Sequence, residues 1–306
     1  MGDELFIIGA GPAGLTAGIY GARAGFDVTI LEKAMPGGYM GTVDYIENYP
    51  GFPEGIRGFD LAELMKKQAQ RFNVKIVGTE VTALDRDGET MNIRTDSTGF
   101  QSSAVIITTG TSPKKLGVKG EDELRGRGIS YCATCDGPLF KNKKVAVIGC
   151  GNSGLQEGRF LLNFVDSVVF VEILPTITAE AILQHAFDGE TRAKFLLLHQ
   201  LISINGGQRV ESITVKDLDT GKDNNIEVNG VFIYAGLVPA SGFLKGFVDL
   251  DQHGYVITDH ELQTSVPGVF AAGDIRSGSR RQVITACGQG AEAALNAYHY
   301  VEKMCN

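Results

Sequence analysis

The sequence contains no tryptophan, and its five cysteines are too few and too unevenly spaced for a disulfide-stapled secreted domain. Basic residues are also scarce, because 28 Lys and Arg stand against 36 Asp and Glu and give a formal net charge of −8. This balance argues against a nucleic-acid-binding protein, which needs a basic surface. No apolar run reaches the roughly 18 residues of a membrane span, and the start of the chain lacks the basic lead of a signal peptide. We therefore expect a cytoplasmic protein without nucleic-acid or membrane partners.

Glycine, in contrast, is abundant, with 40 of the 306 residues. The usual share is roughly 7%, and the chain shows no collagen-like period, so the excess glycines are expected at specific turns. The length predicts about two domains. An Ala-rich helix is expected near the C-terminus, from about Gln289 to Lys303.

A strand, glycine loop, helix and second strand occur twice along the chain. The first copy has the loop GAGPAG at residues 9–14, and its second strand ends at Glu32. The second copy has the loop GCGNSG at residues 149–154, and its second strand ends at Glu172. In each copy 23 residues separate the first glycine from the acid. This internal repeat predicts two related α/β domains.

Each copy has the residue types that bind a dinucleotide. The glycines let the backbone approach a pyrophosphate, the helix N-terminus offers free N–H groups, and the acid accepts from a ribose hydroxyl. The alternatives are turn glycines without a ligand, or a second domain that kept its fold after losing its ligand. The candidate residues for NAD in the second copy are Gly149, Gly151, Asn152, Ser153, Gly154 and Glu172.

The residues after the second copy's strand bear on the choice of nucleotide. A 2′-phosphate needs Arg or Lys near this strand end, but no Lys or Arg occurs between Arg159 and Arg192. The carboxylate of Glu172 favours a free 2′-hydroxyl, so the sequence favours NADH over NADPH. The alternative is that Glu172 is only a solvated carboxylate.

The run CATCD at residues 132–136 is the expected chemical centre. Cys132 and Cys135 can close a small disulfide ring and supply a nucleophilic thiolate, and Asp136 can transfer a proton during thiol exchange. The rival interpretations are an unreactive pair, or half of a zinc site in a non-enzymatic module. Zinc needs four ligands, and no second C-x-x-C or paired histidines occur, so we expect no metal. We expect no catalysis by the other three cysteines, Cys150, Cys287 and Cys305.

Several longer motifs together resemble one family along nearly the whole chain. They are GAGPAGLTAGIYGARAG from residue 9, ENYPGF at 47–52, ITTGT at 107–111, ISYCATCDG at 129–137, VAVIGCGNSG at 145–154, VPGVFAAGDI at 266–275 and RQVITACGQGAEAA at 281–294. The chain thereby resembles the low-molecular-weight thioredoxin reductases, which are FAD-dependent class II pyridine nucleotide-disulfide oxidoreductases.

The resemblance implies an α/β fold of two Rossmann-like, three-layer ββα domains, the second inserted into the first. The FAD domain would comprise residues 1–116 and 244–306, and the NAD(P)-type domain with the C-x-x-C would comprise residues 117–243. The resemblance also implies a homodimer that reduces thioredoxin or a thioredoxin-like protein.

The family's site residues carry over to matching positions of this chain. Cys135 would face the flavin, Cys132 would attack the protein disulfide, and Asp136 would be the acid. The residues implied for FAD are Gly9, Gly11, Pro12, Ala13, Gly14, Glu32, Lys33, Gly37, Gly38, Tyr39, Asn48, Val81, Gly110, Asp274, Gln282 and Val283.

The chain also departs from the family pattern. VEILPTITAEAI at residues 171–182 replaces the family's HRR…R cluster, so the motif for the NADPH 2′-phosphate is lacking. NADH is therefore the expected electron donor, and ferredoxin or a deazaflavin is the alternative. Tyr39 stands where the family commonly has Gln.

Overall fold

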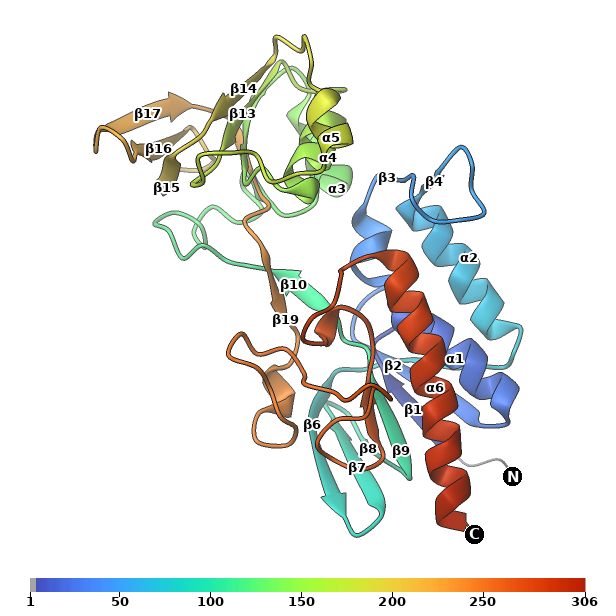
Figure 1. The fold of residues 1–306 in the computed structure, drawn as a ribbon. Coiled ribbons are helices and arrows are strands. Elements are labelled where there is room, and N and C mark those ends of the chain that lie inside the picture. Colours follow the sequence, from blue (N-terminus) through green and yellow to red (C-terminus); the bar gives the residue numbers. More distant parts are fainter. Residues whose placement is uncertain (1–3, 306) are drawn as a thin grey trace. The chain divides into compact units, whose positions relative to one another are not determined.

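The computed structural model describes residues 4–305, which divide into two compact units (Figure 1). Unit 1 contains the described residues up to Ser112 and those from Val238 onward, and unit 2 is Pro113–Leu237. Strands β10 (Thr111–Pro113) and β19 (Leu237–Pro239) pair with each other where the chain passes between the units.

The expected boundaries fall after residues 116 and 243, whereas the two units divide after Ser112 and after Leu237. Leu116 and Val118 pack against the core of unit 2, and so belong to it. Leu244 is fully buried in the core of unit 1, and Ser241 donates from its hydroxyl to the Gly254 carbonyl in the same unit at 2.6 Å.

Unit 1 contains a parallel sheet in the order β20-β9-β1-β2-β5. The strands are β1 (Glu4–Ile8), β2 (Asp27–Glu32), β5 (Lys75–Gly78), β9 (Ala104–Ile107) and β20 (Val269–Ala271). Its helices are α1 (Pro12–Ala24), α2 (Gly58–Gln70) and α6 (Val283–Cys305). The smaller elements are η1 (Gly38–Thr42), β3 (Tyr45–Ile46), β4 (Ile56–Arg57), β6 (Val81–Asp87), β7 (Thr90–Thr95), β8 (Gly99–Ser102), η3 (Gly242–Leu244) and η4 (Gly273–Ile275).

Alternate residues of β1 enter two different cores, which makes three layers. Leu5 and Ile7 pack with the helices on one face of the sheet, where α1 and α6 lie side by side. Phe6 and Ile8 pack on the other face against the antiparallel sheet β6-β7-β8. A strand buried on both faces is apolar throughout, as in other parallel sheets.

Unit 2 repeats this arrangement. Its parallel sheet has the order β11-β18-β12-β13-β14. The strands are β11 (Ile129–Ser130), β12 (Lys144–Ile148), β13 (Ser167–Val171), β14 (Ala193–Leu196) and β18 (Gly230–Ile233), and an antiparallel layer contains β15 (His199–Asn205), β16 (Ser212–Asp217) and β17 (Asp223–Glu227). Its helical elements are α3 (Ala133–Asp136), η2 (Gly137–Phe140), α4 (Asn152–Leu161) and α5 (Ala181–His185). The expected α/β class with two three-layer Rossmann-like domains is confirmed.

The last helix differs from the sequence-based expectation. Helix α6 begins at Val283, six residues before the expected start at Gln289. The first turns contain Val283, Ile284 and Thr285, whose branched side chains have low intrinsic helix propensity. Packing of Ala286 against the core of unit 1 stabilises these turns. No helix among residues 4–305 combines the length and apolar character needed to cross a membrane.

Candidate active site and nucleotide-binding loops

The first glycine loop joins β1 to α1 at the carboxyl edge of the sheet in unit 1. Gly9 has a φ of +108°, and a Cβ at Gly14 would lie 1.9 Å from the Gly9 carbonyl oxygen. A Cβ at Gly11 would meet no atom within 4 Å. The first turn of α1 has neither an acidic residue nor a side-chain cap. The loop is therefore open, and its free N–H groups can donate to the oxygens of a phosphate.

Glu32 and the paired glycines Gly37 and Gly38 lie against this loop. The Glu32 carboxylate accepts from the backbone N–H of Ala10 at 2.7 Å and of Ala34 at 2.8 Å. Each carboxylate oxygen retains a lone pair, which suits a ribose hydroxyl. Gly37 N–H donates to the Ala10 carbonyl at 2.8 Å, and a Cβ at Gly38 would lie 3.1 Å from Gly11 Cα. These residues fit the FAD that the family motifs imply.

Other expected FAD residues meet at the same edge from distant parts of the chain. Asn48 Nδ2 donates to Gln282 Oε1 at 3.1 Å, and Val283 then begins α6. Asp274 accepts from the Ser279 hydroxyl at 3.3 Å, and burial raises the pKa of its carboxyl. The expected set also includes Pro12 and Ala13 in the first turn of α1, Tyr39 in η1, and Gly110 after β9.

Two expected FAD residues have other partners in the structure. Val81 is 8% exposed and packs in the core beside β6-β7-β8. Lys33 Nζ forms an exposed ion pair with Glu80 Oε1 at 3.1 Å.

The second glycine loop copies the first in its backbone. Gly149 has a φ of +105°, and a Cβ at Gly154 would lie 2.0 Å from the Gly149 carbonyl oxygen. Glu172 accepts from the backbone N–H of Cys150 at 2.7 Å and of Leu174 at 3.1 Å. Gly151 and Ser153 lie at the start of α4, as expected. The side chain of Asn152 is engaged elsewhere, because it bonds to Glu180.

Cys150 is fully buried in this loop. Burial, with a smaller contribution from the Glu172 carboxylate, raises the pKa of its thiol to about 12. The thiol is therefore protonated at neutral pH and a poor nucleophile. Cys287 is also buried, and the Tyr49 hydroxyl donates to its sulfur at 3.8 Å.

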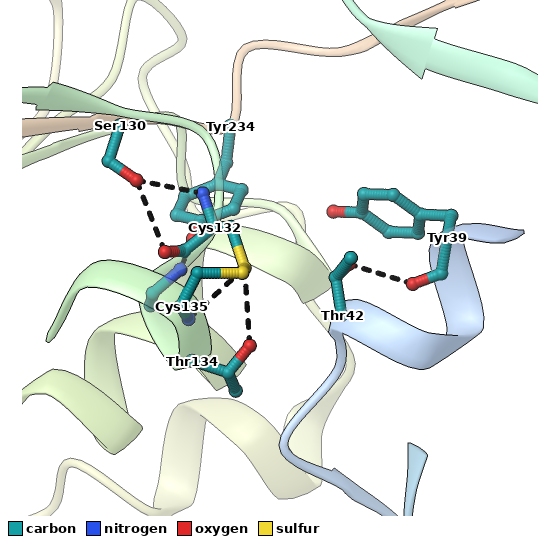
Figure 2. Close-up of a disulfide and its surroundings, with 8 residues drawn as sticks. Tyr39, Thr42, Ser130, Cys132, Thr134, Cys135 and Tyr234 are labelled. Atoms are coloured by element: carbon teal, nitrogen blue, oxygen red, sulfur yellow. Dashed lines mark hydrogen bonds between the residues drawn. A yellow bond between two sulfur atoms is a disulfide. The ribbon is translucent and has the colours of Figure 1, made fainter. Parts of the chain in front are cut away.

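Cys132 and Cys135 form a disulfide at the start of the short helix α3 (Figure 2). The Cys135 N–H donates to Cys132 Sγ at 3.2 Å, and the Thr134 hydroxyl oxygen lies 3.3 Å from the same sulfur. The Cys132 side chain is half-buried and Cys135 is exposed. Asp136 is half-buried at the end of α3, directly after Cys135.

Two residues that the sequence analysis did not single out hold this segment in place. Ser130 Oγ accepts from the Cys132 N–H at 3.0 Å and donates to the Cys132 carbonyl at 3.1 Å. Tyr234 Oη accepts from the Ala133 N–H at 2.9 Å. A Ser two residues before a loop is a local signal for such a turn, but Tyr234 is 101 residues from Ala133 and has none.

The chemistry of this segment lies in its two cysteines. The disulfide uses both thiols of the C-x-x-C. Among the described residues, no group of three or more His, Cys, Asp or Glu is arranged to hold a metal ion. The arrangement favours thiol–disulfide exchange over metal binding.

Comparison with known proteins gives the same interpretation. The family model for pyridine nucleotide-disulphide oxidoreductase matches residues 3–290. The chain belongs to this family. A thioredoxin reductase of Listeria innocua serovar 6a is 40% identical over 305 residues, covering 98% of this chain and 94% of its own length.

Two solved structures agree with this assignment. Thioredoxin reductase from Lactococcus lactis has a TM-score of 0.96 at 36% identity, and that from T. acidophilum has 0.94 at 41%. Each comparison covers 98% of this chain and 99% of the other. The predicted resemblance to low-molecular-weight thioredoxin reductases is confirmed, and with it an FAD-dependent disulfide oxidoreductase.

Proposed function

We propose that the chain passes electrons from NADH, through FAD in unit 1, to the Cys132–Cys135 disulfide and then to a thioredoxin-like protein. The observation that carries this proposal is the disulfide itself, held at the surface of a nucleotide-type unit. FAD, when bound, supplies reversible two-electron chemistry. The glycine loop, Glu32, Asp274 and the start of α6 would hold it in unit 1.

The reduced C-x-x-C performs the exchange with the protein substrate. The Cys132 thiolate attacks one sulfur of the partner's disulfide, and the other partner sulfur leaves as a thiolate that takes up a proton. The Cys135 thiolate then attacks Cys132 Sγ and releases the second partner thiol. The disulfide between Cys132 and Cys135 is restored, and the partner has gained two electrons and two protons.

The local geometry supports Cys132 as the attacking thiol. Its sulfur accepts from the Cys135 N–H, and a hydrogen bond of this kind stabilises a thiolate. Ser130 and Tyr234 fix the backbone on both sides of it. Asp136 lies close in sequence to both cysteines and is proposed as the acid that protonates the leaving thiolate.

The preference for NADH rests on Glu172. This carboxylate is 8% exposed and oriented by two backbone N–H groups, as Glu32 is in unit 1. It can accept from a ribose 2′-hydroxyl, but it repels a 2′-phosphate. The next two residues, Ile173 and Leu174, are exposed and apolar, so they offer no cation to a phosphate.

A donor other than a nicotinamide nucleotide is the second candidate, with ferredoxin or a deazaflavin in that role. The observation in its favour is the hydrogen bond between Asn152 and Glu180, which brings a carboxylate to the second glycine loop. Both candidates share the same flavin and the same disulfide, so they differ only in the first electron transfer.

An anaerobic titration separates the two candidates. NADH, NADPH and reduced ferredoxin are added separately to the oxidised holoenzyme, and the flavin absorbance is followed. We expect bleaching by NADH at lower concentrations than by NADPH. If only reduced ferredoxin bleaches the flavin, ferredoxin rather than NADH is the donor. The proposed disulfide chemistry is unaffected by that result.

A trapping experiment tests the roles of the two cysteines. The partner is a thioredoxin-like protein that lacks its resolving cysteine and whose remaining cysteine carries thionitrobenzoate as a mixed disulfide. With Cys135→Ser, the Cys132 thiolate should attack the protein sulfur of that disulfide, release the thionitrobenzoate anion and form a stable mixed disulfide between the two proteins. Cys132→Ser should form no such adduct. Turnover of the disulfide protein by Cys135→Ser would contradict the scheme.

Two further expectations from the resemblance belong to this proposal, namely a homodimer and a cytoplasmic location. Light scattering of the holoenzyme tests the first, because a dimer has twice the mass of the 32.7 kDa chain. Fractionation of the source cells tests the second.

A further inference from the structure

A covering segment folds back over the second glycine loop. The backbone N–H groups of Thr178 and Ala179 both donate to the Cys150 carbonyl at 3.2 Å. The Thr178 hydroxyl lies 3.8 Å from the position that a Cβ at Gly151 would occupy. The segment, residues 175–180, is therefore in direct contact with the loop.

Glu180 ends this covering segment and pairs with the first residue of α4. Asn152 Nδ2 donates to Glu180 Oε1 at 3.0 Å, and the Glu180 N–H donates to Asn152 Oδ1 at 2.8 Å. The amide is thus engaged through both of its polar atoms. The N-terminus of α4 is where the diphosphate of a dinucleotide would bind. The pairing places a carboxylate beside that position.

The two arginines that flank this segment in the chain are paired with another acid. No Lys or Arg lies between Arg159 and Arg192 in the chain. Both of these arginines pair with Glu190, at 3.4 Å and 2.8 Å. The loop therefore faces Glu172 and Glu180 with no basic side chain from the covering segment.

The first glycine loop provides an internal comparison. The carbonyl of its second residue, Ala10, accepts from the Gly37 N–H at 2.8 Å, and the residue after Gly37 is Gly38. Neither has a side chain. The first residue of α1 is Pro12, which has no polar side-chain atom to bind a carboxylate. The same backbone arrangement is thus open in unit 1 and bears an acid in unit 2.

We propose that Glu180 determines the affinity of the second nucleotide site, because its carboxylate repels the diphosphate of a bound dinucleotide. The inference rests on the proposed nucleotide-driven function and adds that Glu180 limits the affinity for the nucleotide. Ligands that lack phosphate are insensitive to Glu180. Ligands with two phosphates bind more weakly than they would without its charge.

Calorimetric titration of the oxidised holoenzyme with ADP-ribose and with adenosine tests this proposal, since neither ligand transfers electrons. Glu180→Gln keeps an oxygen for Asn152 and removes the charge. We expect this variant to bind ADP-ribose about tenfold more tightly than the wild type, because one close like charge is lost. Its affinity for adenosine should change less than about twofold. Glu227→Gln is the matched control, because Glu227 is an exposed carboxylate of unit 2 on β17. It should change neither ligand.

The outcomes separate this inference from the proposed function. If Glu180→Gln binds ADP-ribose no more tightly than the wild type, or if no variant binds it, the inference is overturned. Equal tightening of ADP-ribose and adenosine would also overturn it, because the effect would not act through phosphate. The proposed donor fails independently if NADH does not bleach the wild-type flavin, whatever ADP-ribose does. The proposed disulfide chemistry also fails independently if the dithionite-reduced enzyme cannot reduce a thioredoxin-like protein, whatever the affinity for ADP-ribose.

Discussion

The backbone N–H of Cys150 donates to Glu172 Oε2 across 2.7 Å. Ala10 and Glu32 form the same bond, at the same length, at the equivalent positions of unit 1. In both units the acid also accepts from the N–H two residues further on. The two halves of the sequence repeat thus form the same hydrogen-bond arrangement, and each holds a carboxylate beside its glycine loop.

The charge of Glu172 should set the choice between the two nicotinamide nucleotides. Glu172→Gln removes the repulsion of a 2′-phosphate and weakens the acceptor for a 2′-hydroxyl. We expect the preference for NADH over NADPH in kcat/KM of flavin reduction to fall by about tenfold or more, since a charged hydrogen bond contributes roughly 1.5–3 kcal/mol. An unchanged ratio in a folded variant would mean that Glu172 does not contact the ribose.

The contact between α1 and α6 depends on Gly290. A Cβ there would lie 2.1 Å from the Ala13 carbonyl oxygen, whereas a Cβ at Gly288 in the same helix would meet nothing within 4 Å. Gly290→Ala should therefore destabilise the protein by about 1–3 kcal/mol or more, because the helices must separate. Gly288→Ala should be neutral, or stabilising by up to about 1 kcal/mol.

Urea unfolding and retention of the FAD absorbance measure these two effects. Since Ala13 lies in the first turn of α1, Gly290→Ala should also weaken FAD retention. If the two alanine variants have equal stability and retain FAD equally, the close contact of α1 and α6 does not limit either property.

A buried carboxylate connects the start of unit 2 to the redox segment. Glu121 is 3% exposed and accepts from the N–H groups of Leu116 at 3.1 Å and Gly117 at 2.6 Å, and from the Tyr131 hydroxyl. Burial and the Glu121 carboxylate raise the pKa of Tyr131, which remains a neutral donor. Tyr131 directly precedes Cys132.

Removal of the Tyr131 hydroxyl, which donates to Glu121, should destabilise the fold. Tyr131→Phe should lower the free energy of unfolding by about 1–3 kcal/mol, because a buried charged acceptor loses a partner. Glu121→Ala should cost more, since it leaves three donors without an acceptor. Tyr20→Phe, at a tyrosine that is 41% exposed, is the control and should have little effect in the same urea titration. A Tyr131→Phe variant as stable as Tyr20→Phe would contradict this account.

Alkaline pH should destabilise the fold through Cys150. Its thiol has a pKa of about 12 in the folded chain, above the ordinary value of 9.0. Between these values the unfolded chain releases a proton that the folded chain keeps, so the free energy of unfolding falls as the pH rises from about 9 to 12. Tyr49, whose pKa burial and Cys287 raise to about 12, acts in the same direction above pH 10.

Denaturant titrations at several pH values measure this dependence. Cys150→Ala should show a shallower decline between pH 9 and 12 than the wild type. In the native wild type, Cys150 should also resist alkylation by iodoacetamide at pH 8 until the chain is unfolded. Rapid alkylation of the native protein at Cys150 would refute the buried, protonated thiol.

The family, the three-layer fold and the chemical centre could all be predicted from the sequence. The reason is that each depends on local requirements. Gly9 and Gly149 need a positive φ, Gly14 and Gly154 need close backbone contact, and alternate apolar residues fill two cores from one strand. The C-x-x-C can close its ring over a separation of three residues.

Contacts between distant residues were decided only by the tertiary structure. Glu180 reaches Asn152 across 28 residues, and Tyr234 reaches Ala133 across 101. The early start of α6 likewise follows from packing that no local pattern encodes. Short-range backbone geometry is specified by residue type and spacing, but the partner of a polar side chain depends on which segments the folded layers bring together.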